Sequence, residues 1–160
     1  MFIYKFRLNI IKQPFLSKYA IMYDMEVYNM DGKFSLEFKK CDNKTIISVS
    51  GGICVKNSTD LKNMVIDNEE LSDFIILNMS NVDFLDSIGI AALINLNKEL
   101  LKIGKKFVII TDTPQILRVI KITQLNKIIH ILSDMEKLDR LMNSGFEFNR
   151  NQIGKYPSEV

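Results

Sequence analysis

The segment "NVDFLDSIGIAAL", residues 81–93, contains a change of hydrophobic periodicity that decides the predicted fold. In its first half, apolar and polar residues alternate, as in a β-strand with one solvent-facing side. After the pair Asp86-Ser87 the apolar residues recur at helical spacing, and Gly104 is a typical helix-ending residue. The sequence therefore predicts a strand that turns at Asp86 and Ser87 into a helix over residues 88–103.

The remaining segments predict strands and helices that alternate along the chain. Residues 34–40 and 45–50 show the apolar alternation of two strands, and Asp42-Asn43 between them favours a hairpin turn. Further predicted elements are helices beginning near residue 58, at Pro114 and at Ser133, and strands over residues 73–80, 105–111 and 126–132. This order predicts an α/β fold, a mixed four- to five-stranded sheet with about four helices packed on it.

Composition and charge indicate one globular domain with an unusual beginning. The chain has 160 residues, of which 47% are hydrophobic and 25% charged, and its net charge is +2. Residues 1–23 contain basic residues and no acidic ones, so we expect residues 1–30 to be a disordered leader or to precede the native start. Contact of residues 1–23 with a membrane surface is the less favoured alternative. The domain is predicted over residues 31–142, followed by a loose tail over residues 143–160.

The sequence lacks the residues that several classes of function require. Outside the leader the chain is slightly acidic, which argues against nucleic acid as the partner. Cys41 and Cys54 show no metal-ligand spacing and are expected to be free thiols in the reducing cytoplasm. The single histidine, His130, lies in a strand-like run and is expected to be structural. We therefore expect a protein that is not an enzyme, with no catalytic residues, cofactor, metal or small-molecule substrate. The sequence also lacks an apolar run of about 18 residues, so no transmembrane helix is predicted.

The position of Ser87 allows two interpretations of its hydroxyl. At the N-cap or in the first turn of a helix it would accept a hydrogen bond from a backbone N–H, and Asp86 could do the same. Alternatively the hydroxyl is a phosphoacceptor, because a helix N-terminus tolerates the negative charge of a phosphate. Charge repulsion would then expel a partner docked over the turn. The turn follows a buried strand, which is the usual place for a binding site in an open α/β sheet.

Two segments, "LNMSNVDFLDSIGIAAL" (residues 77–93) and "GKKFVIITDTPQILRVIKITQLNKIIHIL" (residues 104–132), resemble the STAS domains of the anti-sigma factor antagonist family. The resemblance covers residues 33–142 and implies the same fold as the periodicity. It also implies that Ser87 is the phosphoacceptor and that Asp86 is its acidic neighbour. The helix-start residues that it places close to the partner surface are Ile88, Gly89 and Ile90.

The resemblance implies a function as well as a fold. In the family, the unphosphorylated antagonist binds an anti-sigma factor that has serine kinase activity, and so frees a sigma factor. Phosphorylation by that kinase ends the interaction. The expected partner of this protein is therefore an anti-sigma factor with serine kinase activity, and the expected process is regulation of transcription.

The sequence also departs from the pattern of many antagonists. Those proteins carry a second Ser or Thr after the acceptor, where this chain has Ile88, and acidic residues after the second strand, where it has Gly52 and Cys54. Serines at the acceptor position also occur in STAS proteins of stress-signalling scaffolds and of membrane lipid-transport complexes. A non-catalytic STAS subunit of such an assembly is therefore the alternative, with Ser87 as a plain N-cap.

Overall fold

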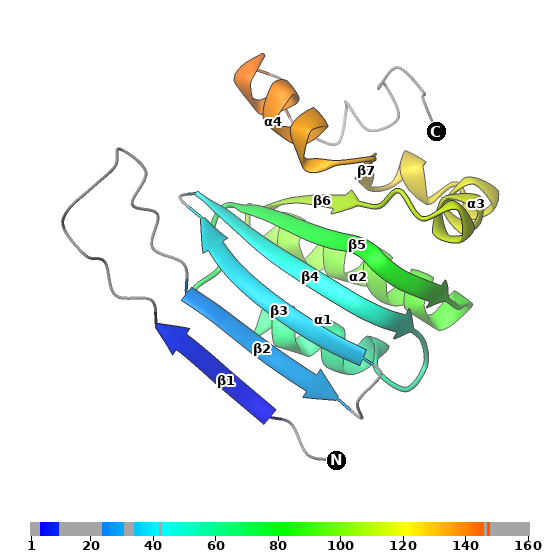
Figure 1. The fold of residues 1–160 in the computed structure, drawn as a ribbon. Helices are drawn as coiled ribbons and strands as arrows, with labels where there is room; N and C mark the ends of the chain where they lie inside the picture. The colour runs from blue at the N-terminus through cyan, green and yellow to red at the C-terminus, as the bar shows by residue number, and fades with distance from the viewer. Residues whose placement is uncertain (1–3, 10–23, 31–33, 42, 146, 148–160) are drawn as a thin grey trace.

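One mixed sheet organises the computed structural model, which describes residues 4–9, 24–30, 34–41, 43–145 and 147 (Figure 1). Its strands are β1 (Tyr4–Asn9), β2 (Asp24–Met30), β3 (Phe34–Cys41), β4 (Lys44–Ile53), β5 (Phe74–Leu85), β6 (Lys106–Ile110) and β7 (His130–Leu132). The helices are α1 (Ser58–Ile66), α2 (Ser87–Lys102), α3 (Pro114–Thr123), the short 3-10 helix η1 (Leu125–Lys127) and α4 (Met135–Asn143). The strands lie side by side in sequence order.

The predicted mixed sheet with four helices is confirmed. Strands β3 and β4 form the predicted antiparallel hairpin, and β4, β5, β6 and β7 are parallel to one another. A helix connects each successive pair of these parallel strands, as parallel connections require. The five strands from β3 to β7 are therefore the predicted sheet.

Two strands within the predicted leader extend this sheet. β1 and β2 pair antiparallel with each other, and β2 pairs antiparallel with β3. These strands were not predicted from the sequence, in which residues 1–23 stand out by their basic composition. The other residues of the leader and, except for residues 143–145 and 147, the predicted tail over residues 143–160 lie outside the described residues.

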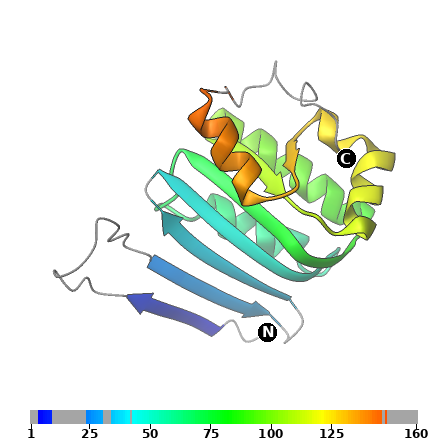
Figure 2. The same ribbon diagram turned by 45° about the horizontal axis from the view of Figure 1, so that its top comes forward.

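Helices cover the two faces of the sheet unequally. Alternate residues of the parallel strands, such as Ile75 and Ile109, join the main core with residues of α1, α2 and α3. Their neighbours, such as Ile76 and Val108, form a smaller core with Leu138 of α4. Figure 2 accordingly shows α4 on the opposite face of the sheet from α1 and α2. This division follows from the period of two in strands that are covered on both faces.

Several element boundaries differ from the prediction. β4 continues beyond the predicted end at residue 50, through Gly51 and Gly52 to Ile53, because it remains paired with β5 as far as Leu85. The last predicted strand is shortened to β7, since η1 occupies its first residues. At α4 the N-cap is Asp134, whose carboxylate accepts from the N–H of Lys137 at 2.7 Å. Ser133, the predicted cap, donates to the Asp134 carboxylate at 2.7 Å.

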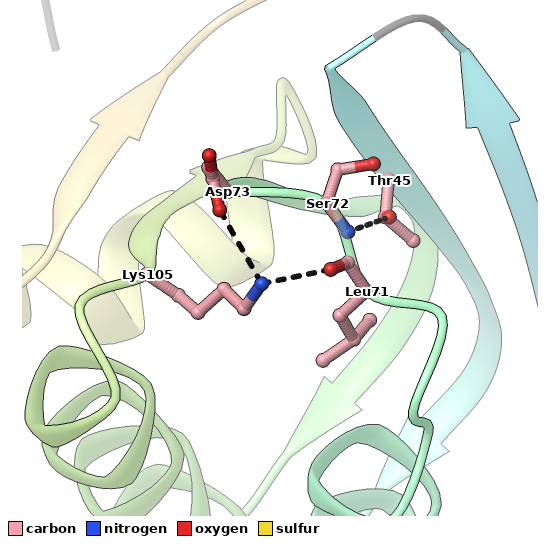
Figure 3. Close-up of polar contacts among 5 residues, drawn as sticks. All are labelled: Thr45, Leu71, Ser72, Asp73 and Lys105. Carbon is pink, nitrogen blue, oxygen red and sulfur yellow. Dashed lines mark hydrogen bonds and ion pairs between the residues drawn. The ribbon is translucent and has the colours of Figure 1, made fainter.

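The amino end of β5 is fixed by contacts to two neighbouring segments (Figure 3). The Lys105 ammonium, from the turn between α2 and β6, donates to the carbonyl oxygen of Leu71 at 2.8 Å and lies 3.5 Å from Asp73. The hydroxyl oxygen of Thr45 in β4 accepts from the N–H of Ser72 at 2.9 Å. These contacts hold the amino end of β5, and its carboxyl end leads into the turn before α2.

Candidate functional site

Asp86 organises the turn from β5 into α2, at the carboxyl end of the parallel strands. One carboxylate oxygen accepts a hydrogen bond from the N–H of Gly89 at 2.7 Å, so Asp86 is the N-cap of α2. The other oxygen accepts from the N–H of Val55 at 3.2 Å, in the loop between β4 and α1. The backbone N–H of Asp86 donates to the carbonyl oxygen of Ile53 at 3.3 Å. The turn is thus tied to the end of β4 by backbone and side chain.

Gly89 allows this close approach of α2 to β4. A Cβ atom at position 89 would lie 2.5 Å from the carbonyl oxygen of Ile53 and 2.8 Å from a methyl carbon of Leu85. Real Cβ atoms essentially never approach other atoms so closely, and the nearest contact is to backbone. Gly89 is therefore a packing residue, buried beneath the turn.

Ser87 is the first residue of α2 and is exposed to solvent. Since Asp86 provides the cap, the helix end does not require the serine hydroxyl. No hydrogen bond of this hydroxyl is found within the part of the chain that the structure describes. The Ser87 side chain is thus accessible to solvent, and its oxygen is not needed to cap the helix.

Exposed apolar side chains lie on the three segments that meet at the Asp86 turn. Val55 of the β4–α1 loop is 65% exposed, Phe84 of β5 is 56% exposed, and Ile88 of α2 is 48% exposed. We call Val55, Phe84, Ser87 and Ile88 the switch surface. Large apolar side chains that remain in water on adjoining segments are typical of a surface that docks another protein.

The structure separates the other residues that the resemblance grouped with Ser87. Gly89 is buried, and Ile90 is half-buried against the main core. Of the helix-start residues, only Ile88 therefore contributes an exposed side chain to this surface. Val55 and Phe84 were not predicted to belong to this surface. For Phe84 the reason is that strict alternation places it on the same face as the buried Val82.

Irregular pairing explains the exposure of Phe84. The register between β4 and β5 shifts twice near the carboxyl end, so that two residues of β4 oppose three of β5 each time. The side chains of β5 consequently follow a period of three there, with Met79, Val82 and Leu85 buried and the residues between them exposed. The sequence carries no clear signal for these bulges.

The loop that carries Val55 is held by a second side chain that was not predicted. Buried Asn57 accepts a hydrogen bond from the N–H of Cys54 at 2.9 Å and donates to the carbonyl oxygen of Gly52 at 2.8 Å. Cys54 is a half-buried free thiol. Asn57 and Asp86 together fix the loop beside Ser87.

The residues considered for other chemistry lie apart from this turn. His130 is buried on β7, and Cys41 is a half-buried free thiol at the end of β3. Among the described residues, no group of three or more His, Cys, Asp or Glu side chains is placed to hold a metal ion. None of the helices in the described ranges combines the length and the apolar character needed to cross a membrane.

Comparison with known proteins identifies the family of this domain. The sequence model of the STAS domain matches residues 35–138. A protein of Thermotoga maritima, assigned as an anti-sigma factor antagonist, superimposes with a TM-score of 0.60 at 22% identity, over 66% of this chain and 92% of its own. An anti-sigma factor antagonist from Mycobacterium paratuberculosis gives a TM-score of 0.59 at 22% identity, over 72% of this chain and 97% of its own.

The same fold occurs in a protein of another type. A sulfate transporter family protein from Wolinella succinogenes superimposes with a TM-score of 0.56 at 18% identity, over 64% of this chain and 89% of its own. At such identities the structural matches establish the fold alone. Because the sequence match spans well over half of the chain and the fold agrees, the protein belongs to the STAS domain family.

Proposed function

We propose that this protein is a regulatory binding module, an anti-sigma factor antagonist that is switched by phosphorylation of Ser87. In the unphosphorylated state it binds an anti-sigma factor with serine kinase activity and so frees a sigma factor. The observation that carries the proposal is the exposed Ser87 hydroxyl, which the helix cap does not use and which lies at a turn where segments with exposed apolar side chains meet. The antagonists among the structurally similar proteins support the same role.

The position of Ser87 suits a switch that leaves the fold intact. A phosphate on the first residue of α2 would lie at the positive end of the helix, which favours it by about 0.3–1 kcal/mol. It would also repel the neighbouring Asp86 carboxylate, by about 1 kcal/mol at about 6 Å in water and by up to about 5 kcal/mol where a docked partner excludes the water. A partner that buries the phosphate against Val55, Phe84 and Ile88 would add a desolvation cost. Since each 1.4 kcal/mol is about tenfold in affinity, one phosphate is sufficient to release a partner.

Phosphorylation with a matched serine control tests the assignment. Incubation with ATP and a serine kinase of the anti-sigma factor class is expected to add one phosphate to the wild type and none to Ser87→Ala. Ser80→Ala, which removes another exposed serine near the carboxyl end of β5, is expected to be labelled like the wild type. Equal labelling of Ser87→Ala and wild type would refute the site.

The alternative function is that of a non-catalytic STAS subunit of a stress-signalling scaffold or a membrane lipid-transport complex. Gly52 and Cys54 favour it, because they stand where many antagonists carry acidic residues, and the end of β4 and the loop that contain them adjoin the switch surface. The sulfate transporter family protein shows that the fold also occurs outside the antagonists. Under this alternative, Ser87→Asp would leave partner binding unchanged, whereas the antagonist proposal predicts its loss.

A further inference from the structure

Strand β5 extends beyond its neighbour β6 and leaves part of one edge unpaired. Its pairing with β6 ends at Asn78 and Ile110, whereas its pairing with β4 continues to Leu85. In Figure 1 the end of β5 accordingly continues past β6. The chain after β6 turns away into α3, and no described strand lies along this edge after Asn78. An unpaired edge presents backbone N–H and C=O groups that can pair with another segment.

The start of α3 and this open edge border a shallow, open hollow of about 450 Å³. Residues 80–83 and residues 113–115 line it. The Thr113 hydroxyl donates to the carbonyl oxygen of Ser80 at 3.1 Å, so a side chain takes the place of a strand at this one position. Because Thr113 is engaged there, it provides no side-chain cap for the first N–H groups of α3. The hollow therefore adjoins backbone donors of the first turn of α3 as well as the edge of β5.

The charges at the hollow favour one kind of occupant. Asp83 is the single charged residue among those that line it, and this side chain is exposed. A small anion would be repelled by this carboxylate, and a small cation would be opposed by the positive end of α3. An extended peptide carries both N–H and C=O groups, so it can pair with the strand edge and with the helix end. A Lys or Arg side chain on that peptide would complement Asp83.

We propose that this hollow, the β5-edge groove (residues 80–83 and 113–115), binds an extended, basic segment of a protein partner by strand addition to β5. Four residues of β5 span about 13 Å at roughly 3.3 Å per residue, so the groove accommodates a segment of three or four residues. The binding does not depend on phosphorylation of Ser87. It provides a second point of attachment near the carboxyl end of β5, which also leads to the switch surface.

Titration of the whole 160-residue chain with short peptides tests the proposal. The probes are an end-capped Val-Lys-Val-Lys-Val peptide, its Val-Glu-Val-Glu-Val counterpart and an N-methylated lysine peptide that has lost alternate N–H donors. We expect the lysine peptide to shift the amide resonances of residues 80–84 and of the first turn of α3. The N-methylated and glutamate peptides are expected to bind more weakly, because the first has lost donors for strand pairing and the second is repelled by Asp83.

Charge reversal supplies the matched control. Asp83→Lys is expected to weaken binding of the lysine peptide by about three- to tenfold and to strengthen binding of the glutamate peptide. Glu69→Lys makes the same charge change at an exposed residue before the amino end of β5 and should leave both affinities unchanged, as should Ser87→Ala. Equal binding of the N-methylated peptide, or shifts that map elsewhere, would overturn strand addition.

Two further outcomes would show that something other than an extended basic peptide occupies the β5-edge groove. Concentration-dependent shifts of residues 80–84 without any peptide would show that a second copy of this chain fills the groove. Binding of N-acetyl-lysine amide with the affinity of the pentapeptide would show a site for a single cation. Both outcomes contradict the proposal.

Discussion

The Asp86 carboxylate joins the start of α2 to a loop that is 31 residues earlier in the sequence, because it accepts hydrogen bonds from the N–H groups of Gly89 and Val55. The helix cap and the position of Val55 therefore depend on the same side chain. A new charge on Ser87 would act first on this carboxylate. The loop that presents Val55 is thus coupled to the residue proposed as the switch.

Substitutions of Asp86 are expected to separate its two hydrogen bonds. Asp86→Asn retains one acceptor oxygen, and since Asn is as good an N-cap as Asp, we expect the bond from Gly89 to persist. The bond from Val55 is lost, which lowers the free energy of unfolding by about 0.5–1.5 kcal/mol. Asp86→Ala loses both bonds, and its cost is expected to be about 1–3 kcal/mol. Urea denaturation measures both values.

Amide hydrogen exchange identifies which bond has been lost. The Val55 amide should exchange faster in both variants, whereas the Gly89 amide should exchange faster only in Asp86→Ala. A Val55 amide that remains equally protected in Asp86→Asn would show that the loop is held without Asp86. In that case Asn57 alone would fix the loop.

Gly89→Ala is expected to destabilise the protein, although alanine normally favours helices. At an unconstrained helical position the change from glycine to alanine stabilises by about 1 kcal/mol. Here the added methyl group would displace the carbonyl oxygen of Ile53, which also accepts the Asp86 N–H. We expect a net loss of about 1–3 kcal/mol in urea denaturation, the usual cost of overpacking.

The reverse substitution in the same helix calibrates this prediction. Ala91 is exposed on α2, so Ala91→Gly should cost only the ordinary helical propensity, about 1 kcal/mol. If Gly89→Ala were as stable as the wild type or more stable, the close approach of α2 to β4 would be wrong.

The sequence was sufficient to predict the order of elements from β3 to α4, because the buried residues of these strands and helices recur at the regular spacing of each element. Buried positions alternate along β3, and the apolar face of α2 repeats at helical spacing. The turn at Asp86 was also predictable, since a strand pattern changes there into a helix pattern. These features depend on local sequence, so no knowledge of distant contacts was needed.

The composition of the switch surface was not predictable in the same way. The exposure of Phe84 depends on register shifts between β4 and β5, and the position of Val55 depends on hydrogen bonds to Asp86 and Asn57. The pairing of β1 and β2 with the sheet likewise depends on contacts between distant segments. Such contacts depend on tertiary structure, and a hydrophobic pattern does not contain them.

The N-cap of α4 is expected to weaken at acidic pH. Hydrogen bonds from the Ser133 hydroxyl and from the backbone N–H of Lys137 lower the pKa of Asp134 below its usual value. A group whose pKa is lowered on folding stabilises the folded state above its unfolded pKa, and this contribution is lost as the pH falls through the folded value. The N-terminus of α4 should therefore fray below the ordinary range of aspartate titration.

Removal of the Ser133 hydroxyl tests the main cause of this shift. Ser133→Ala is expected to raise the pKa of Asp134, measured by the NMR titration of its carboxyl carbon, and to move the fraying of α4 to higher pH. Glu136→Gln changes a nearby exposed carboxylate that does not cap the helix, so it serves as the control. An unchanged pKa of Asp134 in Ser133→Ala would contradict the assignment.

Lys105 is expected to stabilise the amino end of β5 through the Leu71 carbonyl and not through its ion pair with Asp73. The carbonyl bond is 2.8 Å long, whereas the Asp73 carboxylate lies at 3.5 Å and its side chain is 92% exposed. Lys105→Met should lower the free energy of unfolding by about 0.5–1.5 kcal/mol, because it leaves that carbonyl without its donor. Asp73→Asn should change it by less than about 0.5 kcal/mol, as is usual for exposed ion pairs. Urea denaturation of both variants, at low and at high salt, distinguishes the two contacts. A large, salt-sensitive loss in Asp73→Asn would show instead that the ion pair holds this end of the strand.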